Sequence, residues 1–223
     1  MREVRVGFLT IGQSPRRDIL NDIEPILQRQ KIEFIECGAL DNLSKSQIYS
    51  LQPESDEDYI LVTRLLDGTE VKVSRSKIVK RMQECISKLE NQVEVFGLFC
   101  TGEFPELRSK KLLIEPSILL KKIVEALPTK VSLTVLIPSA DQEKKIREKW
   151  KEYEEITVIP ISPYTSTLRD FKDKLKGVNA GQLVIMDCFG YSLEMKKITM
   201  DMLKRPVILP RTLLASVISE ISY

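Results

Sequence analysis

VFGLFCTGEFPEL at residues 95–107 and VIMDCFGYSLEM at residues 184–195 are two versions of one pattern within this 223-residue sequence. Cys100 aligns with Cys188, each cysteine is followed at the second position by glycine, and both stretches end in Glu-Leu or Glu-Met. In each stretch the cysteine follows a short apolar run that is typical of a buried strand. The pattern therefore places a cysteine at the carboxyl end of a strand twice.

A second pair of stretches follows the first at similar spacing. IEPSILLKKIVEAL at residues 114–127 aligns with ILPRTLLASVISEI at residues 208–221, which matches Pro116 with Pro210 and both Leu-Leu pairs. Matches of Cys, Gly and Pro do not follow from hydrophobicity alone. The sequence therefore predicts two copies of one α/β unit, each ordered as strand, cysteine loop, helix, strand, proline and helix.

Short apolar runs alternate with amphipathic stretches along the whole chain, which is typical of βα units around a largely parallel sheet. One interruption is the stretch 59–73, where Asp67-Gly68 lies between two β-rich arms and predicts a hairpin. The predicted strands are Val4–Ile11, Ile32–Cys37, Val93–Phe99, Leu112–Ile114, Leu133–Ile137, Ile156–Pro160, Leu183–Met186 and Val207–Leu209.

The composition restricts the classes of function. The sequence is 43% hydrophobic and 30% charged, which favours a soluble globular protein. Its 34 Lys and Arg against 32 Asp and Glu give a net charge of +2, so no global field favours nucleic acid or an anionic membrane. No histidine occurs, which excludes Ser-His-Asp and Cys-His catalysis and imidazole metal ligands. Proton chemistry must fall to Cys, Asp, Glu, Lys or Tyr.

The four cysteines are widely spaced and form no CxxC pair, so we expect neither a disulfide framework nor a metal site. Cys85 is in helical register with Met82 and Leu89, and Cys37 ends a strand, so both are interpreted as packed thiols. These observations favour a reducing cytoplasm. The first residues carry charges and read as a strand, not a signal peptide, and no apolar run is long enough to span a membrane.

Cys100 and Cys188 are the candidate catalytic residues. Ligands of parallel α/β sheets bind at the carboxyl ends of the strands, where both cysteines are expected. A glycine turn and a helix are expected after each cysteine, and a helix N-terminus lowers the pKa of a nearby thiol. Two such thiols could remove and return a proton.

A candidate anion site lies at residues 12–17. Ser14 and Pro15 are interpreted as the N-cap and first residue of a helix, so Arg16 and Arg17 oppose the helix dipole in its first turn. One explanation is that backbone N–H groups and at least one arginine bind a carboxylate or phosphate. The other is that Asp18 and Asp22 balance the arginines on a solvated face.

The chain resembles the aspartate/glutamate racemase superfamily and, more closely, the AroM family. The resemblance rests on TIGQSPRRD (10–18), LLDGTEVKVSR (65–75), the Cys100 loop, LIEPS (113–117), DCFGY (187–191) and ILPRTLLA (208–215). It implies two pseudo-symmetric parallel-sheet domains with the active-site cleft between them, and catalysis without a cofactor by Cys100 and Cys188. The implied domains are residues 1–113 plus 211–223, and residues 114–210, with helices 116–127 and 211–222 exchanged.

The residues around the two cysteines differ from those of the racemases that the chain resembles. Racemases of this superfamily read Cys-Asn-Thr and Gly-Cys-Thr at their two cysteines, whereas this chain reads Cys-Thr-Gly and Asp-Cys-Phe-Gly. Phe189 cannot donate to a carboxylate, so the second half is closer to the hydantoin racemase or arylmalonate decarboxylase pattern. The expected substrate-binding residues are Gly12, Gln13, Ser14, Arg16, Arg17, Thr101, Gly102, Gly190 and Arg211.

Three functions remain open from the sequence. The first is a racemase-like or isomerase-like protein that binds a small carboxylate and uses the cysteine pair as acid and base. The second is a non-catalytic sensor or accessory protein with the same anion pocket. The third is a redox-sensing dithiol. The redox interpretation requires the two sulfurs to come within disulfide reach, which a substrate-sized gap would forbid. The expected partner is a small anionic molecule, without nucleic acid, membrane, metal or cofactor, and a homodimer is possible.

Overall fold

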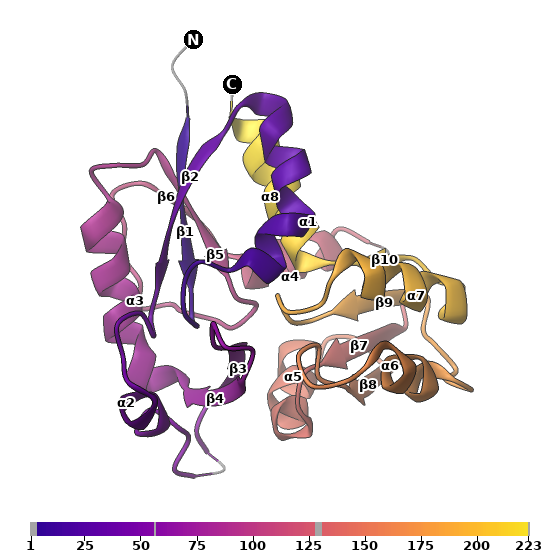
Figure 1. Ribbon diagram of the computed structural model, residues 1–223. Helices are drawn as coiled ribbons and strands as arrows, with labels where there is room; N and C mark the ends of the chain where they lie inside the picture. The colour runs from indigo at the N-terminus through magenta and orange to yellow at the C-terminus, as the bar shows by residue number, and fades with distance from the viewer. Residues whose placement is uncertain (1–3, 56, 128–130, 223) are drawn as a thin grey trace. The chain divides into compact units, whose positions relative to one another are not determined.

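The computed structural model describes residues 4–55, 57–127 and 131–222. By its internal contacts the chain divides into two compact units (Figure 1). Unit 1 consists of Met1–Leu119 and Arg211–Tyr223, and unit 2 consists of Leu120–Pro210. Within the described ranges each unit contains one four-stranded parallel sheet, which confirms the predicted α/β class.

The two sheets have the same strand order. Counted along the chain, the second strand of each sheet is at one edge, followed by the first, the third and the fourth. In unit 1 these strands are β1 (Arg5–Thr10), β2 (Glu33–Gly38), β5 (Val95–Phe99) and β6 (Leu112–Ile114). In unit 2 they are β7 (Leu133–Ile137), β8 (Ile156–Pro160), β9 (Leu183–Met186) and β10 (Val207–Ile208). Equal topology in both units is what the internal repeat predicts.

Amphipathic helices bury their apolar faces against these sheets. In unit 1, α1 buries Ile19, Leu20, Ile23 and Leu27, and α8 places Ile218 against Gly97 of β5. Figure 1 shows α1 and α8 on one side of the unit 1 sheet and α3 on the other. The helices are α1 (Arg17–Leu27), α2 (Lys45–Tyr49), α3 (Arg75–Leu89), α4 (Pro116–Glu125), α5 (Glu143–Lys149), α6 (Leu168–Leu175), α7 (Leu193–Leu203) and α8 (Pro210–Ile221), with short 3-10 turns η1 (Gln28–Gln30) and η2 (Ala140–Gln142).

The predicted hairpin is confirmed as β3 (Ile60–Arg64) paired antiparallel with β4 (Glu70–Ser74). Asp67-Gly68 lies in its loop, and Gly68 has a φ of +91°, a left-handed conformation that favours glycine. Leu61, Val71 and Val73 of the hairpin belong to the hydrophobic core of unit 1. The hairpin is therefore a packed part of this unit.

Two local predictions are wrong. Helix α1 begins at Arg17 with Arg16 as its N-cap, so Ser14 and Pro15 precede the helix, and their peptide bond is cis. The segment after Cys100 forms turns that lead directly to β6, so no helix follows this cysteine, whereas α7 does follow Cys188. The predicted helix-dipole effect on Cys100 therefore has no structural basis.

The expectation of packed thiols at Cys37 and Cys85 is also wrong, because these residues form a disulfide. Cys37 lies in β2 and Cys85 in α3, 48 residues apart, and their Cα atoms are 5.6 Å apart. The local pattern predicted a buried position for each cysteine but did not indicate that α3 packs against the end of β2. The disulfide also removes one basis for expecting a reducing compartment.

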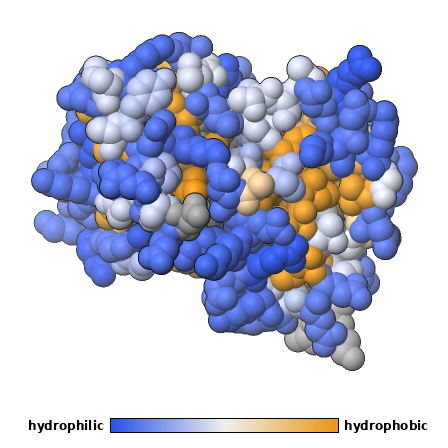
Figure 2. Space-filling model, turned by 90° about the horizontal axis from the view of Figure 1, so that it is seen from below, coloured by the Kyte–Doolittle hydropathy of each residue, from blue (hydrophilic) through white to orange (hydrophobic). Residues whose placement is uncertain are grey.

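The surface is mainly hydrophilic on the face that Figure 2 shows, with most of the visible apolar residues in one region and smaller apolar spots elsewhere. None of the helices in residues 4–55, 57–127 and 131–222 combines the length and apolarity that a membrane crossing requires.

Loss of the Cys37–Cys85 disulfide should lower the free energy of unfolding by about 2–4 kcal/mol, because the bond closes a long loop in the unfolded chain. Urea unfolding of Cys37→Ser, with and without a dithiol, measures this effect. The wild-type midpoint should fall on reduction, whereas the variant should be insensitive to the dithiol. Equal midpoints for oxidised wild type and variant would contradict the prediction.

Candidate functional site

Cys100 follows β5 directly and is 6% exposed. The backbone N–H of Gly102 donates to its Sγ over 3.2 Å. A Cβ at Gly102 would lie 2.8 Å from Leu61 Cδ2 of the hairpin and 3.3 Å from the Cys100 sulfur. A side chain at this position would have to displace Leu61, so glycine lets the loop turn tightly over the thiol beneath β3.

Cys188 has a matching environment in unit 2. It lies two residues after β9, is 7% exposed, and accepts the backbone N–H of Gly190 at 3.4 Å. A Cβ at Gly190 would lie 2.5 Å from Tyr164 Oη, so a side chain is excluded here too. Each thiol is therefore at the carboxyl end of the third strand of its sheet and receives an N–H from the second residue after it. This geometry explains the repeated Cys-x-Gly.

A buried ion pair precedes Cys188. Asp187 is almost fully buried, and its carboxylate accepts from Lys149 Nζ at 2.8 and 3.1 Å and from Trp150 Nε1 at 3.4 Å. Both partners come from the end of α5, a relation that sequence spacing does not reveal. The pair fixes the chain at the residue before the thiol.

Arg75 braces the Cys100 loop from the start of α3. Its guanidinium donates to the carbonyl of Glu103 and to the carboxylate of Glu106, and it lies 5.4 Å from the centre of the Phe104 ring. Arg75 thus joins the end of the hairpin to the loop. Glu106 lies in this loop, outside any helix, unlike Glu194 in α7.

The loop at residues 11–16 lies under the hairpin. Gly12 is so close to β3 that a Cβ would overlap Thr63 Oγ1 and would lie 3.1 Å from the Arg64 carbonyl. Gln13 Oε1 accepts the backbone N–H of Leu66 at 2.9 Å. Ser14 is held by Asp41, whose carboxylate accepts its N–H at 2.7 Å and its Oγ–H at 2.6 Å.

Arg16 and Arg17 have different surroundings. Arg17 is exposed, whereas Arg16 is 3% exposed and donates to both carboxylate oxygens of Asp18, at 2.9 and 2.7 Å. Its Nη1 lies 3.3 Å from Thr10 Oγ1 and from Thr63 Oγ1. Asp18 therefore does balance Arg16, but Arg16 is buried and not on a solvated face.

Burial raises and charge lowers the pKa values of the two carboxyl groups beside Arg16. At Asp18, burial raises the pKa, but the hydrogen bonds and charge of Arg16 outweigh it, so the pKa is below its usual value. At Glu36, which accepts the Arg16 backbone N–H at 3.0 Å, burial prevails and the pKa is raised. At Asp18 the nearby positive charge outweighs the cost of burying the carboxylate, whereas at Glu36 it does not.

Arg211 is the second buried arginine of unit 1. It is 0% exposed, and its Nη1 donates to Asp22 Oδ2 at 2.6 Å and to the Asp18 carbonyl at 2.8 Å. These bonds attach the first turn of α8 to α1. Arg211 therefore supports the helix that begins at the candidate anion site.

Most of the predicted site residues of unit 1 lie beneath strand β3. Leu61 of β3 lies against Gly102 and Thr63 lies against Gly12, so the Cys100 loop and residues 12–16 share this cover. Thr101 is buried in the same loop. Cys188 and Gly190 belong to unit 2. The sequence analysis did not identify Asp41, Thr63, Tyr164 or Lys149. Of these, only Thr63 lies in an element with a clear sequence signal, the hairpin. The described residues contain no group of three or more potential metal-binding side chains.

Solved structures with a similar fold include several enzymes. Picrophilus torridus aspartate racemase has a TM-score of 0.62 at 12% identity, covering 98% of this chain and 94% of that chain. An arylmalonate decarboxylase has a TM-score of 0.60 at 12% identity, with coverages of 98% and 94%. Nocardia farcinica maleate cis-trans isomerase has a TM-score of 0.58 at 12% identity, with coverages of 97% and 91%. At these identities the likeness establishes a racemase-type fold.

The sequence comparisons identify the family. The search of curated proteins found no match. The family model described as AroM protein matches residues 6–222, which is nearly the whole chain. The quoted motifs, the two equal sheets and this match agree, and the chain belongs to the AroM family.

Proposed function

We propose that this protein binds a small carboxylate and acts on its α-carbon without a cofactor, as a racemase or isomerase with Cys100 and Cys188 as the acid/base pair. The observation that carries the proposal is the matched environment of the two thiols. Each is at the carboxyl end of the third strand of its sheet, and each accepts a glycine N–H at its sulfur. A structural cysteine has no need of this arrangement, and its occurrence in both units favours a shared task.

The glycine N–H groups suit proton transfer. A thiolate is a better acceptor than a thiol, so an N–H directed at sulfur favours the charged form that acts as base. One thiolate removes the α-proton, the resulting enediolate is held by arginine and backbone N–H groups, and the other thiol donates its proton to the same carbon. At the end of one turnover the two sulfurs have exchanged protonation states.

Relatives by fold support this class of chemistry. The similar structures include an aspartate racemase, a decarboxylase and a cis-trans isomerase. One structure of the Nocardia farcinica isomerase contains a covalently bound succinylcysteine intermediate, so a cysteine reacts with a dicarboxylate-derived group in that protein. The fold thus accommodates cysteine chemistry on small carboxylates.

The proposed carboxylate site is the start of α1. The N-terminus of this helix carries partial positive charge, and Arg17 is exposed in its first turn. Arg16 and Arg211 are engaged by Asp18 and Asp22, so in this proposal they position the loop and the helix. In this proposal Thr101 supplies a hydroxyl group. Gly12, Gln13, Ser14, Gly102 and Gly190 shape the loops around the site through their hydrogen bonds. Phe189 in place of a hydroxyl residue favours a substrate with an apolar substituent over aspartate or glutamate.

A non-catalytic sensor is the second candidate, and the burial of both thiols favours it. Catalysis requires a sulfur that a substrate can reach, whereas Cys100 and Cys188 are each less than a tenth exposed. A sensor needs only the anion site. Substitution of the cysteines separates the two functions.

Arginine substitutions test the anion site. Malonate binding, measured by calorimetry, should weaken about tenfold or more in Arg17→Gln, because a hydrogen-bonded charge pair is lost. The double variant with Arg16→Gln should show no measurable binding. Arg169→Gln, which removes an exposed arginine of unit 2, is the matched control and should bind normally. Unchanged affinity in the double variant would place the anion elsewhere.

Cysteine substitutions test the chemistry. Cys100→Ser and Cys188→Ser should each slow exchange of the substrate α-proton with solvent deuterium by about 10²–10⁴-fold, because proton transfer is a transition-state role. NMR of a panel of 2-substituted carboxylates in deuterated buffer measures the exchange. Binding of the same compounds should stay nearly unchanged. Binding without exchange in the wild type would favour the sensor.

A further inference from the structure

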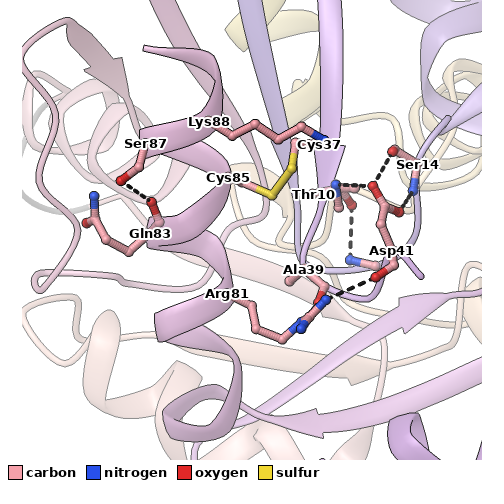
Figure 3. Close-up of a disulfide and its surroundings, with 12 residues drawn as sticks. Thr10, Ser14, Cys37, Ala39, Asp41, Arg81, Gln83, Cys85, Ser87 and Lys88 are labelled. Carbon is pink, nitrogen blue, oxygen red and sulfur yellow. Dashed lines mark hydrogen bonds between the residues drawn. A yellow bond between two sulfur atoms is a disulfide. The ribbon is translucent and has the colours of Figure 1, made fainter. Parts of the chain in front are cut away.

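The Cys37–Cys85 disulfide fastens helix α3 to the end of β2 (Figure 3). Arg81, one helical turn before Cys85, attaches the same helix to the chain just after the strand. Its Nε donates to the Ala39 carbonyl, and its Nη2 donates to the Asp41 carbonyl at 3.0 Å. The helix therefore holds residues 37–41 by one covalent bond and two hydrogen bonds.

The same short segment holds the candidate anion loop. Asp41 accepts both polar hydrogens of Ser14, and it also accepts the Gly38 N–H at 2.8 Å. Leu40 donates its N–H to the Gly12 carbonyl at 3.0 Å. Gly38 is so close that a Cβ there would lie 2.5 Å from Gly12 O. Residues 12–14 and 38–41 therefore form one hydrogen-bonded unit, with the disulfide at its base.

We propose that Cys37–Cys85 is a redox-sensitive clasp that regulates the loop at residues 12–16. In the oxidised protein the clasp keeps Asp41 under Ser14 and the loop ordered. In the reduced protein only packing and Arg81 connect α3 to this segment, so the loop opens more often and binds an anion less tightly. The claim that the disulfide regulates anion binding rests on the proposed function. The claim that it orders the loop does not.

The redox step is ordinary thiol–disulfide exchange. A dithiol reductant attacks one protein sulfur as a thiolate, which forms a mixed disulfide and releases the other cysteine. The second thiol of the reductant then displaces the remaining protein sulfur and leaves as a cyclic disulfide. Two electrons and two protons pass to the protein as two thiols. Because both cysteines are buried, reduction requires local opening of the strand end.

Hydrogen exchange of the full chain, read by mass spectrometry, tests the clasp. Adding a dithiol should speed exchange of residues 10–18 and 36–44 by roughly fivefold or more, which corresponds to about 1 kcal/mol of local stability. Residues 183–195, around Cys188, should not change. As a check on the disulfide, the protein is unfolded and alkylated. The untreated sample should be modified at two cysteines, and a sample that was first reduced should be modified at four.

Variants separate the clasp from general stability. Cys85→Ser should exchange fast at both segments with or without dithiol, whereas Cys188→Ser should keep the wild-type response. Arg81→Met should loosen residues 36–44 although its disulfide is intact. The proposal would be overturned if four cysteines were alkylated before reduction. It would also be overturned if reduction left hydrogen exchange of the two segments unchanged, or accelerated it equally throughout β1 and β9.

Hydrogen exchange in the presence of malonate tests the clasp and the anion site separately. Malonate should protect residues 10–18 more strongly in the oxidised than in the reduced wild type. A redox-dependent loop that malonate does not protect would support the clasp and contradict the proposed anion site. Equal protection in both redox states would overturn the regulatory role of the disulfide.

Discussion

Parallel pairing of β1 with both β2 and β5 is the constraint on which the rest of unit 1 depends. Thr10 is opposite Gly38 on one side and Phe99 on the other, so three strands end at the same level. Three loops consequently leave the sheet from one edge, and they carry Ser14, Asp41 and Cys100. The hairpin cover, the Arg75 brace and the Asp41 hydrogen bonds all join segments that this register brings together. In unit 2, β7 pairs with β8 and β9 in the same way and brings Cys188 to the equivalent edge.

Local sequence signals predicted the strands well. Residues 133–137, 156–160 and 183–186 match the structure to the residue, because each apolar run is bounded by polar or turn-forming residues. The Asp67-Gly68 hairpin was found from its turn residues, and the helices expected at 116–127 and 211–222 are observed at Pro116–Glu125 and Pro210–Ile221. Both cysteine loops were identified because the repeat preserves the Cys-x-Gly spacing, and in the structure each of these glycines lies close to a neighbouring side chain.

The errors concern contacts between distant residues. The Cys37–Cys85 disulfide and the Lys149–Asp187 pair join residues 48 and 38 positions apart, which no periodicity records. The start of α1 was misplaced because Pro15 resembles a first helical residue, whereas the hydrogen bonds of Ser14 to Asp41 hold this segment outside the helix, which begins at Arg17.

The final helix gives the protein a particular order of synthesis. Unit 1 is interrupted after Leu119 and is completed only by Arg211–Tyr223, whereas unit 2 is one continuous segment. A ribosome therefore releases all of unit 2 before α8 emerges. Arg211, which pairs with Asp22 across 189 positions, is made only after all of unit 2. The unit 1 sheet must wait for α8 before Gly97 of β5 is covered by Ile218, whereas unit 2 has its whole sequence available earlier.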